Sequence, residues 1–484
     1  MPRSALKRAA CVALVGSAAA LAMPQGAAAH GLAARADLPV PAWLFAWGAS
    51  LVLIVSFALL SAAWRTVRLQ EERWRPLAAG VSSAIVGPVM QAACGLIGVG
   101  LLVLVVYSGI EGTEDPSRNF SSVFVFVSFW LGVVVLSVLF GGVFRAFNPW
   151  RAIARAFSGA FRLVAGQPAP TPFKYPERLG YWPAVAGLVA FVWLELIYGA
   201  STLTRGLEPH TIAVATIAYS AYTFTAMALF GIDRWIDRGE TFSVYFRMFS
   251  TLSFFEVRDG RLGRRRALTG APSWGEVPGS VALVLVAIGA TSYDGAQEGL
   301  LSGAIKETYG WLTDAGLGLL AGFRINGSLW LLAVIGGFSA LYWLGIRGMH
   351  TVAGSPPTRE LARSFAHSLI PIALAYLVAH YFSFFYFFEQ AQFGYLLSDP
   401  LGDGSDLFGT ANWGIDYGLG SHAIWYTQVG ALVVGHVLAL TLAHDRALAV
   451  YDDVRHATRS QYFMLAVMVA YTCFGLFLLS QANA

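Results

Sequence analysis

The feature that most constrains this chain of 484 residues is the recurrence of long apolar segments. A helix of about 18 or more apolar residues, rising about 1.5 Å per residue, is long enough to cross a hydrocarbon core of about 30 Å. We predict about ten such spans, at residues 42–63, 84–107, 120–144, 181–199, 209–232, 279–293, 327–346, 364–388, 423–443 and 460–480. The 279–293 span is the shortest, and we expect it to tilt or to extend past Tyr293.

The composition agrees with a chain that is built for lipid. The sequence is 56% hydrophobic and 12% charged, whereas soluble globular domains carry about 25% charged residues. A water-soluble surface cannot be made from so few charges. We therefore predict an all-α fold in which residues 30–484 form a single polytopic transmembrane bundle with the lipid bilayer as its surroundings.

The N-terminus has the three parts of a secretory signal peptide. Basic residues come first, an apolar stretch follows over 9–22, and small residues occupy 27–29. At about 14 residues the apolar stretch is too short to span, so we predict a cleavable signal peptide at 1–29. Cleavage after Ala29 would leave His30 first, where its amine and imidazole could chelate a copper ion; the simpler reading is an ordinary residue after the cleavage site.

Charges in the loops alternate between the two sides predicted by the spans. Loops on one side are rich in arginine, as at 65–75, 145–178 and 234–266, and loops on the other carry mainly acid, as at 111–115 and 399–416. Arginine-rich loops face the cytoplasm in membrane proteins. We therefore place the mature N-terminus outside the inner (plasma) membrane. Nucleic acid is not expected as a partner, because the basic residues are not gathered on one water-facing surface.

Ionisable and polar side chains inside the spans are the best indicators of function. Each costs a few kcal/mol to place in lipid, and a charge at mid-span costs about 2.5–3.5 kcal/mol. Such side chains must therefore face the interior of the bundle. Depth along the helices separates them into two groups. The outer group contains Glu195, Asp294, His380 and Gln428, from four different helices. The inner group contains His367, His436 and His444.

A mixture of imidazoles and carboxylates suits either a divalent metal such as Zn²⁺ that holds a water, or a general base. We predict Glu195, Asp294 and His380 as catalytic residues. The predicted metal ligands are His380, His436 and Glu195, and the predicted substrate contacts are Gln428, Tyr381 and Tyr198. The alternative is structural: such side chains often only hydrogen-bond a neighbouring helix. The aromatic run at 381–388 is likewise either a binding wall or an interfacial aromatic belt.

Several short segments along the chain form one recognisable set: His30-Gly31-Leu32, Asp37-Leu38-Pro39-Val40-Pro41, Trp43-Leu44-Phe45-Ala46-Trp47, Asn148-Pro149-Trp150-Arg151, Tyr175-Pro176-Glu177-Arg178-Leu179-Gly180, Trp193-Leu194-Glu195, Phe242-Ser243-Val244-Tyr245-Phe246, His367-Ser368-Leu369-Ile370-Pro371, Ala379-His380-Tyr381-Phe382, Gly435-His436 and Ala443-His444-Asp445-Arg446. Together these segments resemble the fenitrothion hydrolase family of multi-span bacterial membrane proteins. The resemblance implies hydrolysis of the P–O–aryl bond of a small apolar organophosphate triester. It also implies a second membrane subunit as partner.

Two other functions fit the same residues. A transporter or metal-handling membrane protein could use the intramembrane histidines and carboxylates to relay ions or protons. A non-catalytic subunit of a membrane complex would need them only for packing.

Overall fold

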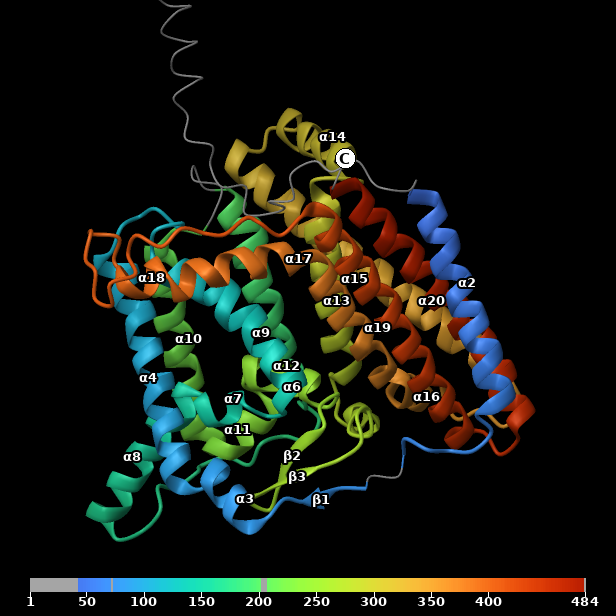
Figure 1. Ribbon diagram of the computed structural model, residues 1–484, viewed down its shortest axis with the longest axis horizontal. Coiled ribbons are helices and arrows are strands. Elements are labelled where there is room, and N and C mark those ends of the chain that lie inside the picture. Colours follow the sequence, from blue (N-terminus) through green and yellow to red (C-terminus); the bar gives the residue numbers. More distant parts are fainter. Residues whose placement is uncertain (1–41, 71–72, 202–206, 483–484) are drawn as a thin grey trace, which may run out of the picture.

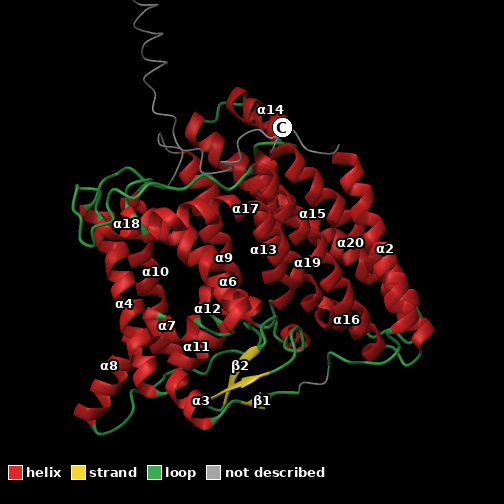
Figure 2. Ribbon diagram, in the orientation of Figure 1, coloured by secondary structure: helices red, strands yellow, loops and turns green. Residues whose placement is uncertain are grey.

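The computed structural model describes residues 42–70, 73–201 and 207–482, and over these ranges the chain is all-α apart from one small sheet (Figures 1 and 2). The structure is 74% helical. The predicted signal peptide and His30 lie outside the described residues, so neither prediction is tested.

The helices differ widely in length. The longer ones are α2 (Ala42–Ala63), α4 (Pro88–Glu111), α8 (Pro149–Ala165), α9 (Trp182–Trp193), α10 (Pro209–Phe230), α13 (Ser280–Gln297), α14 (Ser302–Asp314), α15 (Leu319–His350), α17 (Ile370–Phe393), α19 (Ser421–Val450) and α20 (Val454–Ala482). The shorter α-helices are α3 (Ala79–Val86), α5 (Phe120–Val123), α6 (Val133–Phe140), α7 (Phe144–Phe147), α11 (Ile232–Arg238), α12 (Thr241–Ser250), α16 (Thr358–Phe365) and α18 (Tyr395–Ser398). Two π-helical segments, η1 (Phe124–Gly132) and η2 (Leu194–Tyr198), and three 3₁₀ segments, η3 (Gly199–Ser201), η4 (Ala271–Glu276) and η5 (Ala366–Leu369), complete the set.

Eight helical segments in the described residues are long and apolar enough to cross a membrane. They are Ala79–Glu111, Phe120–Phe140, Trp182–Ser201, Pro209–Phe230, Leu319–His350, Thr358–Ser398, Ser421–Val450 and Val454–Phe477. Eight is fewer than the ten predicted. The two other predicted spans coincide with α2, whose described apolar part is the shorter Trp47–Ala63, and with α13.

Helix α13 corresponds to the shortest predicted span, 279–293. As expected, it extends past Tyr293, and it ends at Gln297. It packs against α9, α15, α17 and α20, and nearly all of its side chains are buried. Because neighbouring helices cover it on several sides, it can carry polar residues that a lipid-facing helix could not.

The helices form two groups that α17 connects (Figure 1). Helices α4, α9 and α10 lie in one group, and α2, α13, α15, α19 and α20 lie in the other, while α17 crosses between them near the top of the view. The contact of α17 with α19 is close: a Cβ atom at Gly435 would lie 2.3 Å from that of Ala375. We call the side of the molecule that carries the sheet the hairpin end.

The sheet at the hairpin end was not predicted. Strands β1 (Arg75–Pro76), β2 (Phe255–Arg258) and β3 (Arg261–Arg264) pair antiparallel in the order β1-β3-β2. The turn between β2 and β3 uses Asp259 and Gly260, both with positive φ, as a tight hairpin requires. Apolar residues at helical spacing between arginines predict two helices lying flat at the inner surface, over 148–164 and 241–257. The second prediction is wrong beyond Ser250, where α12 ends.

The first half of that segment also differs from a surface helix. Most side chains of α12 are buried, and α12 packs against α6 and α9. Its N-terminus is capped by Glu240, whose carboxylate accepts from the backbone N–H groups of Phe242 at 3.0 Å and Ser243 at 2.8 Å. The helix predicted over 148–164 is confirmed as α8, whose Leu163 and Val164 are exposed.

Candidate active site

The polar group that joins most of the predicted site residues surrounds Asp294, on the last turn of α13. Its Oδ2 accepts from Tyr381 Oη at 2.7 Å and lies 2.8 Å from His380 Nε2, both on α17, and its Oδ1 accepts from Gln297 Nε2 at 2.9 Å. We call these four residues the Asp294 cluster. The Asp294 side chain is fully buried, whereas that of His380 is 21% exposed. The structure thus brings together three of the predicted site residues.

This geometry fixes the orientation of the His380 ring. A carboxylate that faces Nε2 favours the tautomer with a proton on Nε2, which leaves the lone pair on Nδ1. Gly295 lies beside Nδ1, since a Cβ atom at position 295 would lie 3.4 Å from it. His380 therefore has the arrangement of a general base held by a buried carboxylate.

Glu195 lies close to the cluster but is not hydrogen-bonded into it in the described structure. It sits in the π-helical segment η2, and such segments are frequent at functional sites. The Glu195 carboxylate interacts electrostatically with the Asp294 carboxylate and with the hydroxyl groups of Tyr381 and Tyr245. The side chain is partly exposed. Glu195 therefore influences the Asp294 cluster through its electrostatic field.

Tyr198, a predicted substrate contact, lies under an arginine. The guanidinium of Arg324 on α15 is 4.4 Å from the centre of the Tyr198 ring, and its Nε donates to Ser201 Oγ at 3.1 Å. The cation–π contact holds a positive charge against the Tyr198 ring. Arg324 was not among the site residues predicted from the sequence.

Two further predicted site residues are His436 and Gln428. Both are buried on α19. His436 Nδ1 is 2.7 Å from the Leu432 carbonyl oxygen, and its ring centre is 6.2 Å from that of Tyr376. His436 thus pairs with the backbone of its own helix.

The arrangement does not present a ready set of metal ligands. Within the described ranges, no group of three or more His, Cys, Asp or Glu side chains is placed to hold a metal ion. His380 Nε2 points at the Asp294 carboxylate itself. The two groups therefore do not converge on a common point where a metal ion could bind. The predicted set of His380, His436 and Glu195 is not gathered, and we derive no step through a metal.

The histidines toward the hairpin end have other surroundings. His444 Nε2 is 3.0 Å from the Trp64 carbonyl oxygen. The neighbouring Asp445 carboxylate is fully buried and accepts from Trp64 Nε1, the backbone N–H groups of Arg68 and Leu69, and Gln70 Nε2, at 2.7 to 3.2 Å. These contacts fix the segment after α2 against α19, so they explain His444 and Asp445 as structural residues.

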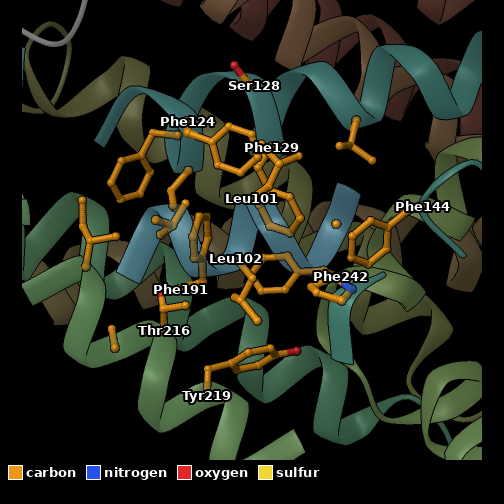
Figure 3. A pocket seen from close by; sticks show the side chains of 18 of the residues that line it. Leu101, Leu102, Phe124, Ser128, Phe129, Phe144, Phe191, Thr216, Tyr219 and Phe242 are labelled. Carbon is orange, nitrogen blue, oxygen red and sulfur yellow. The ribbon is translucent and has the colours of Figure 1, made fainter. Parts of the chain in front are cut away.

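A large apolar cavity lies on the other side of η2. Its volume is about 1120 Å³, and Figure 3 shows aromatic rings from several helices around it. We call it the aromatic cavity. Labelled lining residues are Leu101, Leu102, Phe124, Ser128, Phe129, Phe144, Phe191, Thr216, Tyr219 and Phe242.

The aromatic cavity extends to residues next to Glu195 in the chain. Trp193 and Leu194 line the cavity and directly precede Glu195. The Trp130 ring stacks on Tyr245 at 4.4 Å between centres, and Tyr245 interacts with Glu195. The aromatic cavity and the Asp294 cluster are thus neighbours in the fold.

Three residues of this region were missed from the sequence, for different reasons. Gln297 was identifiable in principle, because it lies three residues after Asp294 on one helix and i, i+3 side chains meet. Gly295 and Arg324 gave no such signal, since their roles depend on contacts with other helices.

The helices and the polar cluster buried among them define a multi-span helical membrane protein. No family model, curated protein or solved structure was found to match the chain, so the class of protein rests on the structure alone.

Proposed function

We propose that this protein is a membrane-embedded hydrolase of lipophilic esters, with organophosphate triesters as the substrate class. The observation that supports it best is the His380–Asp294 pair, a partly exposed imidazole held by a fully buried carboxylate. The resemblance to the fenitrothion hydrolase family suggests the P–O–aryl bond as the bond that is cleaved. An apolar triester can reach such a site from the lipid.

In the proposed reaction, His380 Nδ1 takes a proton from a water molecule while the water oxygen attacks phosphorus. The P–O–aryl bond breaks, and the aryloxide leaves with the bonding electron pair. His380 then returns the proton to the aryloxide, so that the products are a phenol and a phosphodiester. Asp294 stabilises the transient imidazolium, and Tyr381 and Gln297 hold Asp294 in place.

Further parts of the proposal concern the cell. We propose ten spans, with α2 and α13 as the two beyond the eight apolar ones. Cleavage after Ala29 would place the mature N-terminus outside the inner membrane, and a second membrane subunit would be a partner. The acidic loops and the Asp294 cluster would then lie on the outer side.

The test is release of nitrophenol from fenitrothion by purified protein in lipid nanodiscs. His380→Ala and Asp294→Asn are expected to lower the rate at least 100-fold, because a positioned base contributes about 10²–10⁴ to a rate. His210→Ala is the matched control, since His210 is exposed at the start of α10 and outside the cluster. Undiminished hydrolysis by His380→Ala would rule the proposal out.

A second function is favoured by one observation. His367 is fully buried with both ring nitrogens lacking a hydrogen-bond partner in the described structure, and so is Nε2 of His436. Buried imidazoles of this kind suit a relay of protons through water. Proteoliposomes that acidify on an imposed potential, and cleave no ester, would identify a transporter instead.

A further inference from the structure

The aromatic cavity has one polar end, formed by α17. Gln392 lines the cavity, is only 3% exposed, and its Oε1 is buried without a hydrogen-bond partner among the described residues. One turn earlier on α17, Glu389 Oε2 accepts from Ser128 Oγ, at 3.0 Å, and Ser128 also lines the cavity. A buried amide oxygen without a partner indicates a missing ligand or water.

The opposite end of the cavity has polar side chains, but their hydrogen-bonding groups already have partners within the protein. The Tyr219 hydroxyl donates to Glu240 and accepts from the backbone N–H of Thr241 at 3.1 Å. Its hydrogen-bonding capacity is therefore largely used within the protein. The Trp150 indole likewise donates to Ser220 at 2.8 Å. Of the described residues that line the cavity, only Gln392, at the α17 end, has a buried polar side-chain atom without a partner.

The lining excludes a charged ligand. The lining residues within the described ranges include no Asp, Glu, Lys, Arg or His, and most are aromatic or aliphatic. A charged group would lose its hydration there without compensation. The head of any ligand must therefore be neutral.

The cavity also reaches the surface that faces lipid. Ile97 on α4 and Leu136 on α6 both line it, and they are 53% and 41% exposed. Exposed aliphatic side chains on two spanning helices face the bilayer, so a molecule dissolved in lipid could enter from the side.

We propose that the aromatic cavity binds a neutral, lipid-soluble molecule with a hydroxyl group on an apolar body, whose hydroxyl pairs with the Gln392 amide. A hydroxyl group both donates and accepts, so it suits either orientation of that amide. A volume of about 1120 Å³ slightly exceeds that of ordinary ligand sites, which are about 300–1000 Å³. This proposal does not depend on hydrolysis at the Asp294 cluster.

The experiment compares two probes that differ only at the head. Radiolabelled 4-nonylphenol and its methyl ether are bound to the full chain in phosphatidylcholine nanodiscs, with protein-free nanodiscs as background. The phenol is expected to bind at least tenfold more tightly than the ether, because only the phenol can donate a hydrogen bond to Gln392.

Two variants locate the site. Gln392→Leu is expected to reduce phenol binding to the level of the ether, while Gln390→Leu, on the same helix but bonded to the Asp416 backbone, is expected to change neither. Ala190→Phe fills the cavity from α9 and should abolish binding of both probes.

Three results would overturn the proposal. Equal affinity for phenol and ether would show that Gln392 recognises no head group. Unchanged phenol binding by Ala190→Phe would place the site elsewhere. Phospholipid that co-purifies with the protein and that neither probe displaces would show that acyl chains fill the cavity. Unchanged thermal unfolding and size-exclusion profiles of each variant confirm that it folds.

Discussion

Gly295 lies against the imidazole of His380, since a Cβ atom at position 295 would come within 3.4 Å of Nδ1. That distance is an ordinary van der Waals contact, so a methyl group fits and a larger group does not. The glycine thus leaves space next to the nitrogen that the proposed mechanism uses as base.

The first prediction follows from this contact. Gly295→Ala should keep most of the hydrolytic rate, whereas Gly295→Val should lower it at least tenfold by occupying the space where water would sit. Steady-state nitrophenol release, with thermal unfolding of each variant measured in parallel, provides the test. A Val variant as active as the Ala variant would show that water does not approach Nδ1 from this side.

The second prediction concerns metal. Because His380 Nε2 is directed at Asp294, and the described residues contain no three-ligand cluster, hydrolysis should survive chelation. Activity after dialysis against EDTA should equal that of untreated protein, and added Zn²⁺ should not raise it. Loss of activity on chelation with recovery on Zn²⁺ would instead support the metal-bound water that the sequence analysis predicted.

The third prediction concerns the segment after α2. Asp445→Ala removes the acceptor of four hydrogen bonds and leaves the backbone N–H groups of Arg68 and Leu69 unpaired. The expected loss is about 3 kcal/mol in the free energy of unfolding, because charge-assisted bonds are worth about 1.5–3 kcal/mol each and their losses are not additive. Thermal unfolding in detergent measures it, and exposed Asp452→Ala is the control. An equal effect of both substitutions would contradict the assignment.

The fourth prediction is a pH dependence. Burial is the largest cause that raises the pKa of Glu240, and hydrogen bonds from Ser243 and Tyr219 only partly offset it. A raised pKa means that the folded protein binds this proton more tightly than the unfolded chain. Binding of this proton therefore contributes fully to the stability of the folded protein below the ordinary pKa of a glutamate, near 4.5. This contribution is lost as the pH rises through the pKa that Glu240 has in the folded protein.

Comparison of the wild type with Glu240→Gln isolates this effect, because glutamine does not titrate. The difference in unfolding temperature, wild type minus variant, should fall as pH is raised from 4.5. A difference that stays constant or grows with pH would show that the Glu240 carboxyl group is not destabilised by burial.

Much of the scaffold was determined by the sequence itself. The length of an apolar segment is set by the thickness of the bilayer, so eight of the predicted spans appear as apolar helices. The polar positions in and next to the ten predicted spans had to face the interior, and Asp294, His380 and Tyr381 do. The cost of a polar group in lipid acts on each residue separately, which is why local patterns suffice.

The tertiary structure decided which of those side chains meet. Helical periodicity gives the direction of His436 around its own axis, but not the distance between α19 and α13, and His436 faces Tyr376 instead of Asp294. The same holds for Asp445, which the contacts with the segment after α2 make structural. A hydrogen-bonded site needs atoms within about 3 Å of one another, and contacts between residues far apart in the chain are set by the packing of whole helices.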